Sequence, residues 1–347
     1  MESFPAARAV VVLRLSALGD VVLSTPALDA LHAAWPQTRI LYVTTEAFVP
    51  LVRHHPAVAA VEVRRPGEAL HVLAGRLRAH APDAVLDLHG KWQARALAWM
   101  TGASRVVTWH KRPLADTVLV KLRARPYRAA MHISARYHLA VERLVGRALP
   151  RGQLSLHVAD DARARAAALL ADAGVREGEI IVGMSPGANW ETKRWPAERY
   201  AGLARRAGAL GWRAIVTGTP AEAPLAAEVA RAGAHVVDLT GRCGVDVLGA
   251  VIARCRAFVA NDSGPMHMAR ALGVPVLTFF GSTDPRQFDF TGHAALYAGL
   301  QCSACSLYGL PACPLGHFRC MLDLSEQDAW TALERLVAAG VAAPVPG

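Results

Sequence analysis

Long uninterrupted apolar runs are missing from this chain of 347 residues. The apolar stretch over residues 9–23 is broken by Arg14 and Asp20, so it fits neither a membrane span nor the core of a signal peptide. The first residues, Met1-Glu2-Ser3-Phe4, also lack the basic start of a signal peptide. We therefore expect a cytoplasmic protein.

Three fingerprints of common nucleotide and sugar-nucleotide sites are also absent. No G-x-G-x-x-G follows the first predicted strand, no G-x-x-x-x-G-K-[ST] occurs, and there is no Asp-x-Asp pair. The first two absences argue against hydride transfer with a nicotinamide cofactor and against P-loop ATP hydrolysis. Without the Asp-x-Asp pair, a bound diphosphate would have to be neutralised by helix N-termini and basic side chains.

Acidic residues are scarce in the first half of the chain. Residues 1–150 contain 20 Lys/Arg and 10 Asp/Glu, whereas residues 151–347 contain 18 of each, so the net charge of +10 arises in the first half. Basic residues are densest from Arg105 to Arg147, and such a field attracts a polyanion. A nucleic acid, an anionic membrane surface, an acidic glycan and a merely solvated surface remain open. The few aromatic residues there argue against base stacking, so we expect no nucleic-acid partner.

Short β-branched runs alternate with Ala/Leu/Arg-rich amphipathic stretches, which indicates a parallel α/β fold. In the second half the alternation predicts five strands, at residues 180–184, 214–218, 235–238, 257–261 and 274–280. In the first half it predicts strands at residues 9–15, 39–44 and 84–88. The hydrophobic fraction of 53% excludes disorder, and the length suggests two domains. We expect two doubly wound domains, residues 1–155 and 156–347.

Ligands of doubly wound sheets bind beyond the carboxyl ends of the strands, and two predicted loops there carry notable side chains. The first loop ends on Asp20, whose carboxylate can accept a proton from an attacking hydroxyl, or can simply cap a helix. The second loop brings Lys193 and Arg194 next to a helix that begins at Pro196. Both cations can hold a phosphate there, or can be incidental surface residues.

The sharpest signal is a third loop, Asn261-Asp262-Ser263-Gly264-Pro265-Met266-His267, which follows a predicted strand and opens a helix. It offers free backbone N–H groups, a hydroxyl and a glycine that permits close approach, which is how a diphosphate is received. The alternative is an Asp/Ser cap without a ligand.

Taken together and in this order, the three motifs resemble glycosyltransferase family 9, the lipopolysaccharide heptosyltransferases, over about residues 9–325. They are Leu13-Arg14-Leu15-Ser16-Ala17-Leu18-Gly19-Asp20, Pro186-Gly187-Ala188 with Lys193-Arg194-Trp195-Pro196, and residues 261–267. The Lys-Arg-Trp-Pro form is closer to heptosyltransferase II, the second-heptose type, although Pro265 stands where that type commonly has leucine.

The resemblance implies a GT-B fold, with two Rossmann-like domains facing across a cleft. It implies an inverting, metal-independent transfer of heptose from ADP-L-glycero-D-manno-heptose to the inner core of lipopolysaccharide, with no cofactor required. Asp20 would be the general base, and Lys193 would stabilise the leaving diphosphate. The residues that would surround the donor are Asn189, Glu222, Asp262, Ser263, Gly264 and His267.

The resemblance also implies an acceptor, the anionic lipid A core, which would explain the basic first half. We assign acceptor contacts to Ser16, Gly19, Arg112 and Arg128, and leave peripheral contact with the inner membrane open. The alternative within the family is another nucleotide-sugar donor or another glycan acceptor.

Four cysteines form a C-x2-C-x7-C-x6-C series around His317. They are Cys302, Cys305, Cys313 and Cys320. Four thiols at such spacing can hold Zn²⁺ or an iron–sulfur cluster, and they can equally be reduced structural thiols. Disulfides are not expected in a reducing cytoplasm.

Overall fold

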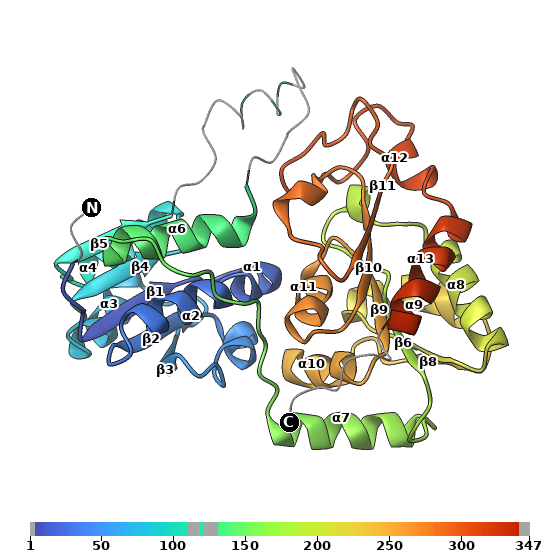
Figure 1. The fold of residues 1–347 in the computed structure, drawn as a ribbon, viewed down its shortest axis with the longest axis horizontal. Coiled ribbons are helices and arrows are strands. Elements are labelled where there is room, and N and C mark those ends of the chain that lie inside the picture. Colours follow the sequence, from blue (N-terminus) through green and yellow to red (C-terminus); the bar gives the residue numbers. More distant parts are fainter. Residues whose placement is uncertain (1–3, 110–117, 119, 121, 123–130, 340–347) are drawn as a thin grey trace. The chain divides into compact units, whose positions relative to one another are not determined.

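A computed structural model describes residues 4–109, 118, 120, 122 and 131–339, and the chain divides into two compact units (Figure 1). Unit 1 comprises the described residues up to 109 together with residues 131–158. Unit 2 begins at Ala159 and also includes the three described residues between 118 and 122.

The described part of unit 1 contains a five-stranded parallel sheet with the order β3-β2-β1-β4-β5. Its strands are β1 (Ala9–Leu13), β2 (Arg39–Thr44), β3 (Val58–Val63), β4 (Ala84–Asp87) and β5 (Arg105–Thr108). The central strand β1 is buried along its whole length, which explains its unbroken apolar run. The strand order reverses between β1 and β4, so a ligand crevice is expected at their carboxyl ends.

Four of the five helices described in unit 1 pack in two pairs. The five helices are α1 (Leu18–Val22), α2 (Thr25–Ala34), α3 (Leu70–Ala79), α4 (Trp92–Met100) and α6 (Ile133–Val145), with a 3₁₀ turn η1 (Glu46–Leu51). Helix α3 lies beside α4, and α2 lies beside α6. Leu73 of α3 and Leu97 of α4 share one apolar cluster with Val11 and Leu13 of β1, so these two helices cover the same face of the sheet.

The described part of unit 2 contains a six-stranded parallel sheet with the order β11-β10-β9-β6-β7-β8. Its strands are β6 (Ile181–Ser185), β7 (Arg213–Val216), β8 (Val236–Asp238), β9 (Ala257–Asn261), β10 (Val276–Phe280) and β11 (Ala294–Tyr297). Here the order reverses between β6 and β9, which places the expected ligand crevice at the ends of those two strands.

Seven helices are described in unit 2, together with three short 3₁₀ turns. The helices are α7 (Asp160–Asp172), α8 (Ala197–Ala209), α9 (Ala223–Ala230), α10 (Val245–Ala253), α11 (Gly264–Ala271), α12 (Arg319–Leu322) and α13 (Glu326–Ala339). The turns are η2 (Glu191–Lys193), η3 (Pro220–Glu222) and η4 (Pro285–Gln287). Within the described part of the chain, no helix combines the length and the apolar character that crossing a bilayer requires.

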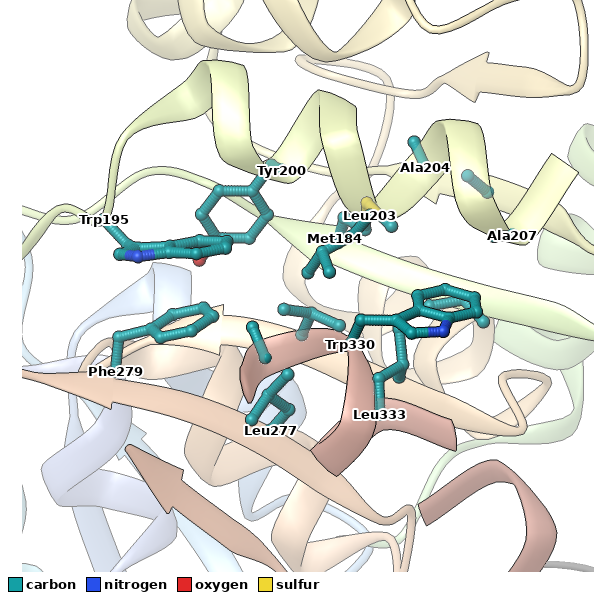
Figure 2. Packing of buried hydrophobic residues seen from close by; sticks show 14 of the residues in the cluster. Met184, Trp195, Tyr200, Leu203, Ala204, Ala207, Leu277, Phe279, Trp330 and Leu333 are labelled. Atoms are coloured by element: carbon teal, nitrogen blue, oxygen red, sulfur yellow. The ribbon is translucent and has the colours of Figure 1, made fainter. Parts of the chain in front are cut away.

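An aromatic stack fixes the segment that follows η2 in the core of unit 2. The Trp195 ring lies on Phe279 of β10 with ring centroids 4.1 Å apart, and Tyr200 of α8 meets the indole edge-on (Figure 2). The indole N–H of Trp195 donates a 3.0 Å hydrogen bond to the Leu324 carbonyl. Because the ring is packed in the core and its N–H is hydrogen-bonded, the backbone on either side of Trp195 has little conformational freedom.

The predicted α/β class is confirmed, and two predicted strands match to the residue: β2 and β9. The prediction of five strands in the second half missed β11, whose sequence Ala-Ala-Leu-Tyr is short, half-buried and without a β-branched residue. In the first half β3 and β5 were missed for a related reason. Both are edge strands with partly exposed side chains. Glu62 interrupts the apolar run of β3, and β5 has only two apolar residues, Val106 and Val107.

Candidate functional site

Asn261, at the carboxyl end of β9, joins the two central loops of unit 2. Its fully buried side-chain oxygen accepts a 2.9 Å hydrogen bond from the Trp195 backbone N–H. Its Nδ2 donates to the carbonyls of Pro186, at 2.7 Å, and Gly187, at 3.3 Å. The loops that follow β6 and β9 are therefore held together at the point where the strand order reverses.

Lys193 and Asp262 form a buried ion pair between these two loops. The Lys193 Nζ lies 2.7 Å from Asp262 Oδ2, which also accepts a 2.7 Å hydrogen bond from the Thr283 hydroxyl. Burial alone would raise the pKa of Asp262, but Lys193, His267 and Thr283 together hold it below its ordinary value. The carboxylate is thus ionised at neutral pH, and the ammonium of Lys193 keeps two N–H donors for a ligand.

Ser263 caps the N-terminus of α11 with an extended backbone, but its side chain makes no capping hydrogen bond. Its Oγ is buried and has no hydrogen-bond partner among the described residues. Leaving a hydroxyl in that state costs about 1–3 kcal/mol, which a bound ligand can recover. Together with the backbone N–H groups of Gly264 and Met266, Ser263 forms a helix start of the kind that can bind an anion, whereas Pro265 has no N–H to donate.

His267 lies one turn further into α11 and is buried against the Phe288 ring, with ring centroids 4.7 Å apart. Burial, together with the positive charge of Arg270, lowers the pKa of His267 to about 3, so the imidazole is neutral. The guanidinium Nη1 of Arg270 lies 3.5 Å from Nδ1 of His267. That contact favours the tautomer with the proton on Nε2, which leaves Nε2 as a donor.

Glu222 reaches the same edge of the sheet from the turn η3. Its carboxylate accepts hydrogen bonds from the Thr219 backbone N–H, at 2.7 Å, and from the Thr219 hydroxyl, at 3.0 Å. A Cβ placed on Gly187 would stand 1.8 Å from Glu222 Oε1, so only glycine allows this approach. Asn189 is exposed two residues further along the loop. The predicted donor residues on the loops after β6, β7 and β9 thus border one region of unit 2.

The cysteine-rich segment supports the loop that carries Lys193. The Thr192 backbone N–H donates to the Leu310 carbonyl at 3.2 Å, and the Leu310 N–H donates to the Thr192 hydroxyl at 2.8 Å. The same hydroxyl lies 3.0 Å from Ser282 Oγ. Thr192, which directly precedes Lys193, is therefore hydrogen-bonded to the segment that holds the four clustered thiols.

None of the six cysteines, all of which lie in the described part of the chain, forms a disulfide bond. Burial raises the pKa of the Cys320 thiol to about 12, and the neighbouring thiols of Cys305, Cys313 and Cys302 add to this effect. Over residues 4–109 and 131–339, no group of three or more His, Cys, Asp or Glu side chains is arranged to hold a metal ion. The described residues therefore give the metal interpretation of this cluster no support.

In unit 1, Asp20 is paired with a buried guanidinium. Arg14 Nη2 contacts Asp20 Oδ2, while its Nη1 donates a 2.7 Å hydrogen bond to the Leu88 carbonyl after β4. Burial would lower the pKa of Arg14, but Tyr137 and Asp20 raise it above its ordinary value. Arg14 is thus a fixed cation that orients the Asp20 carboxylate, which is 35% exposed.

Arg14 was quoted in the motif but was given no role at the sequence level. The pattern that predicts such a role is an arginine directly after a buried strand, since a buried charge requires a partner.

Asp87 was also missed by the sequence analysis. It is fully buried at the end of β4, and its Oδ1 accepts hydrogen bonds from the backbone N–H groups of His89, at 2.9 Å, and Gly90, at 2.8 Å. These bonds shape the loop that presents the Leu88 carbonyl to Arg14.

The remaining predicted acceptor residues have different outcomes. Ser16 and Gly19 lie half-buried in the loop and helix that carry Asp20. Arg112 and Arg128 lie outside the described residues. Their contacts with the acceptor stay a prediction.

Part of the basic stretch from Arg105 to Arg147 holds the fold of unit 1 together. The guanidinium of Arg105 donates to the Leu144 carbonyl at 3.2 Å, and Arg143 donates to the Thr108 carbonyl at 3.3 Å. These two residues tie α6 to β5. At these two positions the basic side chains stabilise the fold, and the choice among the partners left open for the rest of the stretch stays a prediction.

Comparisons with known proteins agree with this arrangement. A model of glycosyltransferase family 9 (heptosyltransferase) matches residues 70–307. The chain is 31% identical to lipopolysaccharide heptosyltransferase 1 of Pseudomonas aeruginosa over 342 residues, 92% of each chain. It is 26% identical to lipopolysaccharide heptosyltransferase 2 of Escherichia coli over 300 residues, 81% of this chain and 84% of that one.

Among solved structures, a family 9 glycosyl transferase from Veillonella parvula matches with a TM-score of 0.79 at 25% identity, covering 96% of this chain and 97% of that one. With the two Rossmann-like sheets, this likeness identifies the fold class as GT-B. Lys193, Glu222 and Asp262 fall inside the range matched by the family model, whereas Asp20 precedes it. Because the relatives include lipopolysaccharide heptosyltransferases 1, 2 and 3, the subtype stays a prediction.

The buried imidazole of His267 generates a prediction about stability. The unfolded chain binds a proton at the ordinary histidine pKa near 6.5, whereas the folded chain binds it only near pH 3. The free energy of unfolding of unit 2 should therefore fall as the pH drops from 6.5 to 4, by up to about 1.4 kcal/mol per pH unit for this residue. Urea unfolding at pH 7, 6, 5 and 4 measures the slope.

The variant His267→Asn should have a shallower slope than the wild type. Part of the slope should persist, because burial also lowers the pKa of His293, to about 4. Leu210→Ala, an exposed substitution in the same unit, serves as the control and should keep the wild-type slope. Equal slopes for the wild type and His267→Asn would show that this imidazole is protonated in the folded state.

Proposed function

The chain belongs to glycosyltransferase family 9, and from this premise we propose that it transfers heptose from ADP-L-glycero-D-manno-heptose to the inner core of lipopolysaccharide. One observation carries the proposal. At the ends of β6 and β9, a lysine held by Asp262 lies near the start of α11, where the Ser263 hydroxyl has no partner among the described residues. This arrangement suits a diphosphate.

The donor side of the proposal uses groups that already lie in unit 2. The diphosphate oxygens accept hydrogen bonds from the Ser263 hydroxyl and the first N–H groups of α11, and from the two remaining N–H donors of Lys193. These groups supply the positive charge that a departing diphosphate needs, which supports a metal-independent transfer. Glu222 accepts hydrogen bonds from the ribose hydroxyls, and Asn189 contacts the phosphates.

The chemical step is a single displacement. The Asp20 carboxylate, oriented by Arg14, takes the proton of the acceptor hydroxyl as that oxygen attacks the anomeric carbon of the heptose. The bond from the anomeric carbon to the diphosphate breaks, and ADP leaves with the electron pair. Because attack and departure occur on opposite faces, the anomeric configuration inverts. Lys193 and the start of α11 stabilise the charge that develops on ADP.

The acceptor in this proposal is the lipid A core, an anionic glycolipid. The excess of basic residues over acidic ones in the first half of the chain supports an anionic acceptor. Ser16 and Gly19 flank Asp20, and Arg112 and Arg128 supply positive charge. The proposal places the reaction at the cytoplasmic face of the inner membrane, where the chain meets its acceptor peripherally.

The proposal is tested by mass-resolved transfer with two acceptors, heptose-free core and mono-heptosylated core. With ADP-heptose as donor, we expect the addition of one heptose to one of them. Addition to the mono-heptosylated core alone would support the second-heptose subtype, and addition to the heptose-free core would support the first. A panel of other nucleotide sugars is the control. Faster transfer from one of those donors, or no transfer from any, would contradict the proposed donor.

Replacement of the proposed base should separate binding from chemistry. We expect Asp20→Asn to lower kcat by roughly 10²–10⁴, because proton removal by a positioned base contributes that much, and to leave the affinity for ADP-heptose unchanged. Thermal unfolding must accompany the kinetics, since the variant leaves the buried Arg14 without its counter-charge. Asp83→Asn, in the turn that enters β4 at the opposite edge of the sheet, is the matched control. Near-normal kcat in Asp20→Asn would exclude Asp20 as the base.

Removal of the lysine should weaken donor binding. We expect Lys193→Ala to raise the dissociation constant of ADP-heptose by about tenfold or more, since hydrogen bonds to charged groups contribute roughly 1.5–3 kcal/mol. Calorimetric titration measures the change. The double variant Lys193→Ala/Asp262→Asn removes the unpaired carboxylate as well, so a persistent loss of affinity would assign it to the lysine. Wild-type affinity in both variants would show that Lys193 does not contact the donor.

A further inference from the structure

Helix α4 of unit 1 presents two tryptophans directly away from the core. Its buried residues, Ala94, Leu97 and Ala98, pack against the sheet. Trp92 and Trp99 are seven residues apart, so at about 100° per residue they share one side of the helix, opposite the buried stripe. They are 72% and 82% exposed. Neither indole therefore contributes to the edge of the hydrophobic core.

These two side chains are the most exposed of the eight tryptophans in the chain. Trp35, Trp195 and Trp330 are buried, and Trp190 is 40% exposed. The surface of a globular protein seldom exposes two large apolar side chains on one side of a short helix unless that surface binds a partner or a membrane. Indole combines an apolar body with one N–H donor, and such side chains are enriched where lipid headgroups meet the acyl chains.

The charge around the two indoles is of one sign. Lys91 and Arg95 are exposed beside them, and Arg95 lies between them along the helix. No Asp or Glu occurs from residue 88 to residue 109. A short helix with indoles outward and only cations beside them matches the features of helices that lie in the interface of an anionic bilayer.

We infer that the outward face of α4, formed by Trp92, Trp99, Lys91 and Arg95, docks on an anionic lipid surface. A flat bilayer suits this face better than a protein partner, because a stable protein interface buries about 1,200–2,000 Å² and a convex face of nine residues offers far less. Helix α4 follows the loop whose Leu88 carbonyl binds Arg14. Docking through Trp92 therefore keeps the edge that carries Asp20 close to the headgroups.

The inference rests on the proposed function, which places the reaction at the inner membrane, and deepens it by naming the face that meets the lipid. The experiment is sedimentation of the full chain with vesicles of phosphatidylglycerol and phosphatidylethanolamine, compared with phosphatidylcholine vesicles. We expect the wild type to prefer the anionic vesicles. Trp92→Ser/Trp99→Ser should lower the partition coefficient by about tenfold or more, because both indoles lose their apolar contact with lipid.

The charged residues provide a second, independent variant. Lys91→Gln/Arg95→Gln should weaken binding to anionic vesicles by about fivefold for each charge, with a smaller effect as salt is added. All four side chains are exposed, so the melting temperature should stay unchanged. Leu210→Ser/Leu322→Ser is the matched control. It removes two apolar side chains of unit 2 that are 54% and 44% exposed, and it should bind like the wild type.

Three outcomes would overturn the inference. The wild type fails to sediment with anionic vesicles, or Trp92→Ser/Trp99→Ser binds them as well as the wild type. In the third, the wild type self-associates without lipid and the double variant is monomeric, which would assign the face to a second copy of the chain. Heptose transfer to a delipidated, water-soluble core tests the proposed function separately, because that reaction needs no bilayer.

Discussion

The buried amide of Asn261 is the contact on which the proposed donor site of unit 2 depends. Its oxygen and its nitrogen are both used, and all three of its hydrogen bonds go to backbone atoms of the loop after β6. Because that loop is also anchored by the Trp195 ring in the core, Lys193 is held between two fixed points. An ion pair between Lys193 and Asp262 can then form without the entropy cost of ordering a free loop.

Unit 1 has a similar side-chain-to-backbone hydrogen bond at the point where its strand order reverses. In both sheets the strand order reverses between two neighbouring strands, β1 and β4 in unit 1 and β6 and β9 in unit 2. In each unit, a side chain at the carboxyl end of one of these strands donates a hydrogen bond to a backbone carbonyl just beyond the other strand. In unit 2 Asn261 binds Pro186, and in unit 1 Arg14 binds Leu88. The difference lies in charge. The neutral amide positions the loop for which we propose anion binding, whereas the guanidinium positions a carboxylate. Each unit therefore braces the edge at which its proposed chemistry takes place.

The sequence predicted what local pattern determines. Continuous apolar runs located the buried strands β1, β6 and β9. The segments that follow these strands contain Asp20, in helix α1, Lys193, in the turn η2, and Asp262. Contacts between residues far apart in the chain could not be predicted. The approach of Glu222 to Gly187 depends on the pairing of β6 with β7, and the role of Arg105 depends on α6 returning to β5. A basic residue that binds a carbonyl and one that binds a ligand look identical in a sequence.

The hydrogen bonds of Thr192 have a practical consequence for anyone who modifies this protein chemically. Thr192 precedes Lys193 and is fastened to Leu310, which lies between Cys305 and Cys313. An alkylating label or a fluorophore on either thiol would displace the backbone around Leu310, whose hydrogen bonds to Thr192 help to position Lys193. A loss of affinity for the proposed nucleotide donor after labelling could then be misread as evidence for a thiol in the active site, although the thiols would act only through the hydrogen bonds of Thr192.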